Sequence, residues 1–295
     1  MKNLRAAYRA LGGLIAIPVI AGLSLVQGLV VGPLTHNYSF IPDMIYKGLR
    51  KIFGYKIEFN AASAPLVKDK PVWFLANHMS VTDFITAGSS LNGSFVGKGD
   101  ILKWPGIAQA AKAGKFIGIQ RTSEFNPQSR GKIAKNFNSG FNTIMFPEAT
   151  TNDGSKVYLF HAGLLSLLYG DKAVDKKDRE VELKHEVVVQ PIAIRVKSVN
   201  GKDATGDASL RALYSMHDEG NVLRRLWKRM QVKNITLELT AFEPLDPKNF
   251  KDAKELANTA ALEVASVINP GQKTFEKAKI PHPKSPLKAI LGGKY

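Results

Sequence analysis

The chain has 295 residues and no cysteine, and its 41 lysines and arginines against 25 aspartates and glutamates give a formal net charge of +16. Hydrophobic residues make up 44% of the chain and charged residues 22%, which is the composition of a globular protein and excludes a disordered or collagen-like chain. The lack of cysteine excludes a disulfide scaffold and Cys-rich zinc or iron–sulfur sites. The positive charge predicts an anionic partner, for which a membrane, a nucleic acid and an anionic substrate are the candidates.

The N-terminal region carries a membrane signal. Residues 10–34 contain no charged side chain, and as a straight helix they would span roughly 37 Å, enough to cross a bilayer core. This stretch is longer than the apolar region of a signal peptide, which favours a retained anchor over a cleaved one. Pro18, Pro33 and several glycines disfavour a straight spanning helix, and basic residues flank both ends. A re-entrant hairpin, with both flanks on the cytoplasmic face of the inner membrane, fits this symmetry. A spanning helix and a buried core helix are the alternatives.

Two further segments have an amphipathic helical pattern. The first, at 44–53, has an apolar face at helical spacing, made by Met44, Ile45, Leu49, Ile52 and Phe53. The second, at 222–230, has Trp227 on its apolar face and places Arg224, Arg225, Lys228 and Arg229 away from it. Both patterns predict helices on an anionic membrane surface, and packing on the protein core is the alternative for the second.

Strand and helix signals alternate through the rest of the chain. Strands are expected at 72–76, 94–98, 115–119, 142–146, 187–196 and 235–242, and helices from residue 81 and at 100–113, 127–139 and 251–268. This order predicts an α/β fold with a largely parallel central sheet flanked by helices, after an N-terminal membrane-associated helical hairpin. The segment 171–186 is dense in mixed charge and predicts a solvated loop. The expected domains are N-terminal helices at 1–56, an α/β domain at 57–270 and a basic tail at 271–295.

The first chemical constellation follows the strand at 72–76. His78 comes directly after that strand, and Asp83 lies five residues later. If Asp83 lies in the first helical turn, its carboxylate can bind one imidazole nitrogen and leave the other free as a general base. No partner serine or cysteine accompanies this dyad, which suits a reaction whose nucleophile is the substrate's own hydroxyl. A capped helix with a satisfied histidine is the structural alternative, and no metal-ligand spacing is present nearby.

Charged residues also end other predicted strands. Lys98 ends the strand at 94–98, and Arg121 follows the strand at 115–119 as a candidate ligand of an anionic group such as a phosphate. Glu148 follows a strand and a proline in the segment Phe146-Pro147-Glu148-Ala149-Thr150, where it can bind a substrate hydroxyl, pair with Arg121 or cap a helix.

Taken in order, these segments resemble the four motifs of the glycerolipid acyltransferase family. The resemblance runs over roughly 70–196 and is carried by Asn77-His78-x4-Asp83, by the strand before Arg121, by Phe146–Thr150 and by the strand containing Pro191-Ile192. It implies that His78 is the general base and that Asp83 orients it. The acceptor hydroxyl would attack the thioester of acyl-CoA or acyl-carrier protein directly, with no cofactor and no metal.

The resemblance further implies how the acceptor is bound. Arg121 would bind its phosphate, Glu148 with Ala149 and Thr150 would help bind it, and Asn77 belongs to the same site. Lys98 as a second cation is an inference from its place at a strand end. Backbone N–H groups near the helix start after His78 are the candidate donors to the oxyanion.

The function expected from this resemblance is acyl transfer to a lysophospholipid, with 1-acyl-sn-glycerol-3-phosphate giving phosphatidic acid as the first choice. The family usually has Gly where this chain has Ala149 and often Arg where it has Thr151. These departures make another lysolipid the alternative acceptor, either lyso-ornithine lipid or a lysophospholipid with a larger head group. A non-enzymatic basic protein that binds membranes or nucleic acid is the other alternative, but the chain has no nucleic-acid-binding motif, so no nucleic-acid partner is expected.

Overall fold

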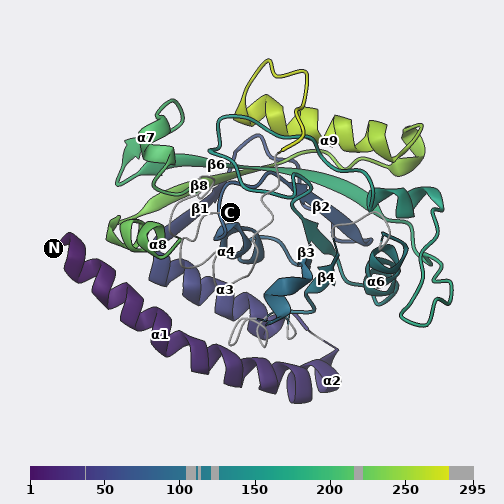
Figure 1. Ribbon diagram of the computed structural model, residues 1–295, viewed down its shortest axis with the longest axis horizontal. Helices are drawn as coiled ribbons and strands as arrows, with labels where there is room; N and C mark the ends of the chain where they lie inside the picture. Colours follow the sequence, from purple (N-terminus) through teal and green to yellow (C-terminus); the bar gives the residue numbers. More distant parts are fainter. Residues whose placement is uncertain (37, 104–110, 112–113, 121–125, 216–221, 279–295) are drawn as a thin grey trace.

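The N-terminal segment forms a helical hairpin. The computed structural model describes the chain except residues 37, 104–110, 112–113, 121–125, 216–221 and 279–295. Helix α1 (Lys2–Val26) continues through a π-helical turn, η1 (Gln27–Val31), into α2 (Gly32–Thr35), and α3 (Phe40–Phe53) runs back alongside α1 (Figure 1). The helix widens just before Pro33, which has no N–H to donate to the preceding turn. The buried Gln27 accepts a 3.0 Å hydrogen bond from the backbone N–H of Ile41 and so joins the two arms.

The central sheet is largely parallel, as expected. In the described part of the chain its strands are β1 (Tyr55–Phe59), β2 (Val72–Ala76), β3 (Ser94–Lys98), β4 (Ile117–Ile119), β5 (Thr143–Met145), β6 (Val188–Val199), β7 (Lys202–Asp203) and β8 (Ile235–Ala241). Their order is β1-β8-β6-β2-β5-β3-β4, with β7 paired to β6. The strands β7 and β8 run antiparallel to β6, whereas all other pairs are parallel. The carboxyl ends of β2, β5, β3 and β4 therefore share one edge, where ligands of α/β sheets bind.

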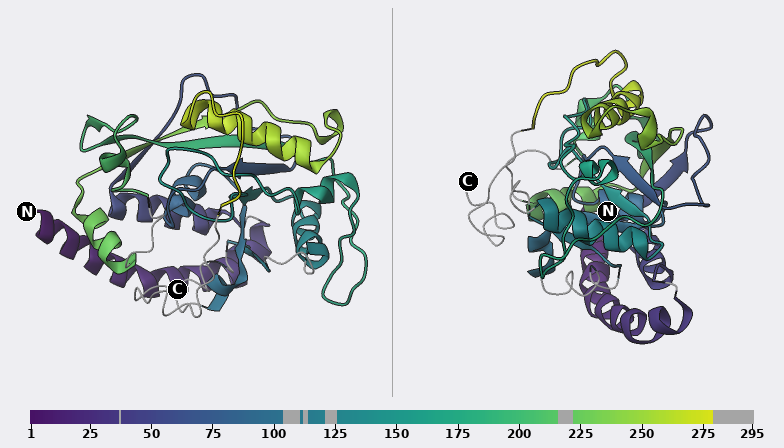
Figure 2. Two further views of the ribbon diagram at one scale, coloured as in Figure 1. Left: turned by 45° about the horizontal axis from the view of Figure 1, so that its top comes forward. Right: turned by 90° about the vertical axis from the view of Figure 1, so that its right-hand side faces the viewer.

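Helices cover both faces of the sheet (Figures 1 and 2). On one face the core is completed by α6 (Asn126–Asn138) and α9 (Ala253–Ile268), and on the other by α3 and α4 (Asp83–Gly88). Strand β2 is buried along its whole length and alternates between the two cores, with Trp73 and Leu75 in the first and Phe74 in the second. A strand covered on both faces carries a continuous apolar run, which is why its sequence signal is strong. The remaining elements are η2 (Gly99–Lys103), η4 (Leu165–Tyr169), α7 (Ala208–Arg211), α8 (Val222–Gln231) and η5 (Pro247–Asn249).

Most expected elements are confirmed, and two of them begin and end at the predicted residues. Strands β2 and β3 have the predicted bounds, and β4, β5, β6, β8, α6 and α9 differ only at their ends. The segment 171–186 is a loop with a single bridge between Val174 and Glu180. Strand β1 was not expected, and most of the helix expected at 100–113 lies outside the described residues. The division into domains stays a prediction.

Two basic residues of the N-terminus, Arg5 and Arg9, contact the carboxyl end of α8. Arg9 donates to the carbonyls of Met230, Val232 and Lys233 at 3.1, 2.5 and 2.8 Å, and Arg5 donates to that of Gln231 at 2.8 Å. These cations occupy the carboxyl end of α8, where helix carbonyls lack partners and the helix dipole favours positive charge.

The expectation that Arg229 points away from the apolar face of α8 toward a membrane is wrong. Its side chain is 1% exposed. The guanidinium lies 4.3 Å from the centre of the Tyr55 ring and donates a 2.6 Å hydrogen bond to the carbonyl of Phe53. The carboxyl end of α3 and the start of β1 therefore supply this buried cation with one carbonyl acceptor and an aromatic face. Its Nε and Nη1 have no hydrogen-bond partner among the described residues.

Candidate active site

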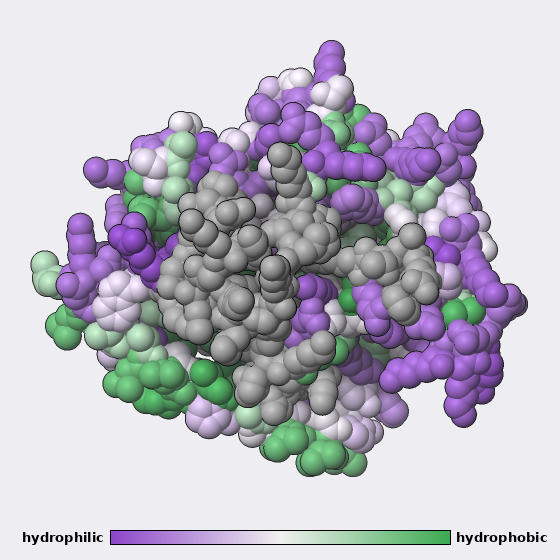
Figure 3. All heavy atoms as spheres, in the orientation of Figure 1, coloured by the Kyte–Doolittle hydropathy of each residue, from purple (hydrophilic) through white to green (hydrophobic). Residues whose placement is uncertain are grey.

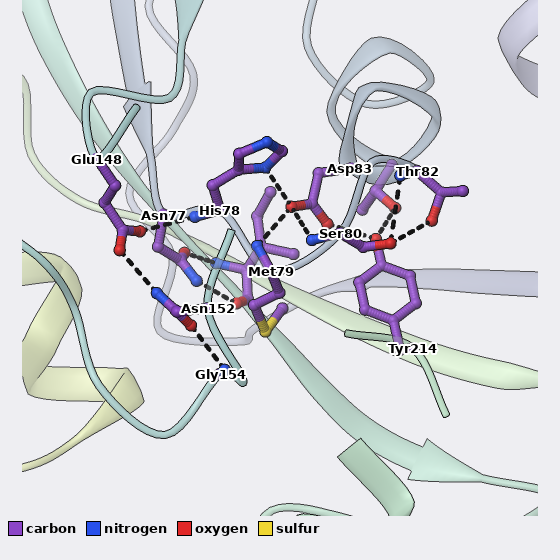
Figure 4. A network of polar contacts seen from close by, with 12 residues as sticks. Asn77, His78, Met79, Ser80, Thr82, Asp83, Glu148, Asn152, Gly154 and Tyr214 are labelled. Atoms are coloured by element: carbon purple, nitrogen blue, oxygen red, sulfur yellow. Dashed lines mark hydrogen bonds and ion pairs between the residues drawn. The ribbon is translucent and has the colours of Figure 1, made fainter. Parts of the chain in front are cut away.

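The predicted dyad is present at the carboxyl end of β2. His78 Nδ1 lies 2.8 Å from Asp83 Oδ2, and the same oxygen accepts backbone N–H bonds from Met79 at 2.7 Å and Ser80 at 2.9 Å (Figure 4). Asp83 is the first residue of α4, so its carboxylate closes the turn between β2 and that helix. A carboxylate that accepts three donors fixes the imidazole tautomer, with the proton on Nδ1 and the lone pair on Nε2. The His78 side chain is 21% exposed and that of Asp83 is fully buried.

The loop after β5 holds His78 from three sides. Glu148 Oε1 accepts a 2.7 Å hydrogen bond from the backbone N–H of His78, and the backbone N–H of Asn152 donates at 2.9 Å to the carbonyl of His78. The ring of Phe146 stacks on the imidazole, with ring centres 4.5 Å apart and planes inclined by 12°. The first and third sequence motifs are therefore one structural unit, in which the third positions the backbone and ring of the histidine.

Glu148 is an internal residue of this unit. Its side chain is buried, and its second oxygen, Oε2, accepts hydrogen bonds from Asn152 Nδ2 at 2.7 Å and from the backbone N–H of Tyr158 at 2.9 Å. Burial raises the pKa of the Glu148 carboxyl to about 8, and the N–H donors of Tyr158, His78 and Asn152 oppose that rise. Asn152 in turn accepts a 2.6 Å bond from the N–H of Gly154. Both oxygens of Glu148 are thus occupied by the chain, and direct contact of Glu148 with an acceptor stays a prediction.

Asp83 has a fourth donor that the sequence did not indicate. The hydroxyl of Tyr214 donates a 2.6 Å hydrogen bond to Asp83 Oδ1 and lies 3.0 Å from Thr86 Oγ1. Burial and the charge of Asp83 raise the pKa of Tyr214 well above its usual value, so the phenol stays protonated. Tyr214 is 131 residues from Asp83, and no local pattern could have connected the two.

The expected oxyanion donors near the start of α4 are engaged elsewhere. The N–H groups of Met79 and Ser80 bind Asp83, that of Thr82 donates to Ser80 Oγ at 3.2 Å, and that of Asp83 donates to the Ser80 carbonyl at 2.9 Å. The expectation is therefore wrong for these four amides. The tight turn that orients Asp83 uses the donors that an oxyanion would need.

The other expected site residues differ in their surroundings. Asn77 is fully buried and exchanges two hydrogen bonds with the backbone of Ile194, so its amide extends the pairing of β2 with β6. Lys98 ends β3 and forms a 2.8 Å ion pair with Asp100 at the same edge of the sheet. Thr150 is partly exposed in the loop after β5. Arg121 lies outside the described residues.

Ala149 has a left-handed backbone, with φ = 60°. Glycine adopts this conformation without steric strain, whereas the methyl group of an alanine comes too close to the following carbonyl oxygen. The departure noted in the sequence therefore falls on a residue where the backbone favours glycine.

The imidazole of His78 is the group at this site that can take up a proton. Among the described residues no set of three His, Asp or Glu side chains converges as metal ligands would. His78 bonds to Asp83 through Nδ1, and no hydrogen bond joins its Nε2 to another described residue. Such a base can deprotonate a substrate hydroxyl, and no serine or threonine in the described part of the chain is bonded to it as a nucleophile.

Comparisons with known proteins support an acyltransferase. The model of the Acyltransferase family matches residues 58–195, which include His78, Asp83 and Glu148. The chain is 27% identical to the lyso-ornithine lipid O-acyltransferase of Brucella abortus over 235 residues, which are 77% of this chain and 81% of that protein. It is 24% identical to the 1-acyl-sn-glycerol-3-phosphate acyltransferase of Neisseria gonorrhoeae over 195 residues, or 65% and 68% of the two chains.

The same fold is found in the crystal structure of the 1-acyl-sn-glycerophosphate acyltransferase PlsC from Thermotoga maritima, with a TM-score of 0.58 and 18% identity over 92% of this chain and 98% of that one. Together with the motifs, these similarities support a glycerolipid acyltransferase family for this chain.

Proposed function

We propose that this protein is a membrane-bound lysolipid O-acyltransferase in which His78 is the general base. The observation that carries the proposal is the 2.8 Å bond from His78 Nδ1 to the buried carboxylate of Asp83, which leaves Nε2 free at the edge of the sheet. Nε2 takes the proton of the acceptor hydroxyl while its oxygen attacks the thioester carbonyl of acyl-CoA or acyl-carrier protein. The new C–O bond forms, the C–S bond breaks, and the thiolate leaves with the proton from the imidazolium.

We propose lyso-ornithine lipid as the preferred acceptor. The relative from Brucella abortus named for this acceptor aligns over more of the chain than the relative from Neisseria gonorrhoeae. Lys98 supports the same choice, because its charge is paired with that of Asp100. A paired cation and anion suit the carboxylate and ammonium of an ornithine head group better than the concentrated negative charge of a phosphate monoester.

The second candidate acceptor is 1-acyl-sn-glycerol-3-phosphate. The relative from Neisseria gonorrhoeae carries this name, and so does the Thermotoga maritima protein that shares the fold. The net charge of +16 would attract either anionic lipid surfaces or an anionic substrate.

We propose that the N-terminal hairpin lies in one leaflet of the membrane. The continuous helix Lys2–Thr35 is long and apolar enough to cross a bilayer, and only 11% of its most apolar window is buried in the protein. Figure 3 shows apolar side chains gathered along the lower edge of the molecule, over α1 and α2. Arg5 and Arg9 tie the amino end of α1 to α8, while α3 turns back along it, so both ends of the hairpin stay at the catalytic domain. Trp227 on α8 is 40% exposed and would enter the interface beside α1.

The test is acyl transfer by the purified full chain in detergent, with labelled acyl-CoA or acyl-carrier protein and the two acceptors offered side by side. His78→Ala is expected to lower kcat about 10²- to 10⁴-fold, because it removes the general base. His185→Ala is the matched control, since that histidine is exposed in the loop 171–186, and it should keep the full rate. A His78→Ala enzyme that retains its turnover would refute the proposal, and equal rates with both acceptors would refute the preference.

A further inference from the structure

Tyr214 is a buried tyrosine with a single carboxylate partner. It follows α7, is fully buried, and donates its 2.6 Å hydrogen bond to Asp83 Oδ1. Its ring packs edge-on against that of Tyr55, with centres 5.4 Å apart. Residue 214 also lies beyond the range 58–195 that the family model matches, so the contact joins the motif region to a segment outside it.

The four donors on Asp83 are of two kinds. Three of them, His78 Nδ1 and the N–H groups of Met79 and Ser80, belong to the turn that Asp83 itself closes and all bind Oδ2. The Tyr214 hydroxyl binds the other oxygen and comes from a distant part of the chain. Because the phenol donates to Asp83, the hydroxyl of Thr86 must donate to the phenol across their 3.0 Å contact. The result is a directed chain from Thr86 through Tyr214 and Asp83 to His78.

We propose that Tyr214 is a positioning residue that holds the Asp83 carboxylate against His78 and sets how strongly the imidazole retains its proton. This role rests on the proposed function of His78 as the general base. A charge-assisted hydrogen bond draws negative charge toward Oδ1 and away from the oxygen that faces the imidazole. Without that donor, Oδ1 is buried and has lost its partner, so that Oδ2 becomes the stronger acceptor. The imidazolium then releases its proton at higher pH.

The experiment compares Tyr214→Phe with Tyr55→Phe in the full chain. Both substitutions remove one hydroxyl from a buried ring, and the two rings are in contact. The Tyr55 hydroxyl, however, binds Thr82 Oγ1 at 2.8 Å and does not contact Asp83. Tyr214→Phe is expected to lower kcat about 10- to 100-fold with little change in KM. The same variant should move the ascending limb of the pH profile of kcat/KM about 0.5–1 unit to higher pH. Tyr55→Phe should leave that limb in place.

A second variant changes the donor without emptying the site. 3-Fluorotyrosine at position 214 keeps the ring and the hydroxyl but is a stronger donor, and it should move the same limb to lower pH. Unfolding by urea verifies that each variant is folded. A wild-type pH profile in both Tyr214 variants would overturn the positioning role, and so would equal losses in Tyr214→Phe and Tyr55→Phe without a pH shift. Retained turnover in His78→Ala would instead overturn the proposed function itself, so the two failures are distinguishable.

Discussion

Glu148→Gln gives the sharpest test of how the loop after β5 holds the dyad. The carboxylate accepts from His78 N–H through Oε1 and from Asn152 Nδ2 and Tyr158 N–H through Oε2, at 2.7, 2.7 and 2.9 Å. Glutamine has the same shape but only one acceptor oxygen. In either orientation, its NH₂ group faces at least one of these donors. Rotating the Asn152 amide so that its oxygen faces the glutamine would break another hydrogen bond, because that oxygen accepts from the N–H of Gly154.

The magnitude follows from the number of donors that lose their acceptor. A buried N–H without a partner costs about 1–3 kcal/mol. If the amide NH₂ of the glutamine points toward His78, one N–H donor loses its acceptor, and we expect the free energy of unfolding to fall by about 1–3 kcal/mol. If the NH₂ points toward Asn152 and Tyr158, two donors lose their acceptor, and the expected loss is about twice as large. In the first orientation the backbone N–H of His78 also loses its hydrogen bond to residue 148. Because His78 is then held less firmly, kcat should fall about tenfold or more.

The assay is urea unfolding of the detergent-solubilised chain together with acyl transfer, both above pH 8, where the Glu148 carboxyl is ionised and accepts through both oxygens. Glu186→Gln is the matched control, since Glu186 is exposed and pairs only with the surface residue Lys248, and its effect should stay within about 0.5 kcal/mol. Glu148→Gln with the stability and the rate of the unsubstituted protein would refute the hydrogen-bond argument.

The same residue predicts a pH dependence of stability. Because burial raises the pKa of Glu148 from 4.5 to about 8, the native carboxyl keeps a proton that the unfolded chain has released between these two values. The native state then binds more protons than the unfolded state, so the free energy of unfolding should decrease as the pH rises from 4.5 to 8. Glu148→Gln removes the titrating group and should flatten this slope. An unchanged slope in the variant would show that Glu148 is ionised throughout.

Two further predictions concern the backbone of the site and the membrane. Ala149→Gly should stabilise the fold by about 0.5–1 kcal/mol, because φ = 60° disfavours an alanine; urea unfolding measures this, and a destabilised variant would contradict it. Leu14→Asp and Leu29→Asp, at positions 65% and 75% exposed on the N-terminal helix, should each weaken sedimentation with anionic vesicles more than tenfold, since an aspartate in the bilayer core costs about 2.5–3.5 kcal/mol. Leu262→Asp on α9, on the far side of the sheet, is the control, and equal sedimentation of all three variants would exclude the hairpin as the anchor.

The sequence determined the elements whose signals are local. Strand β2 and helix α9 were predictable because burial on both faces demands a continuous apolar run in the strand, and burial of one face demands apolar residues at helical spacing. The bond between His78 and Asp83 was predicted only on the condition that Asp83 lies in the first turn of the helix after His78, which is where the structure places it. The class of enzyme followed from these motifs in their order.

The tertiary structure decided everything that depends on contacts between distant segments. Strand β1 has a weak local signal and exists because it pairs with β8, 180 residues later in register. Arg229 shows a solvent-facing pattern on its own helix, yet the end of α3 and the ring of Tyr55 bury it. The hydrogen bond from the backbone N–H of His78 to Glu148 joins residues 70 positions apart, and the bond from Tyr214 to Asp83 joins residues 131 positions apart. Spacing in a sequence constrains neighbours through chain geometry, whereas such contacts arise only from the packing of whole elements, and it is they that hold the general base in place.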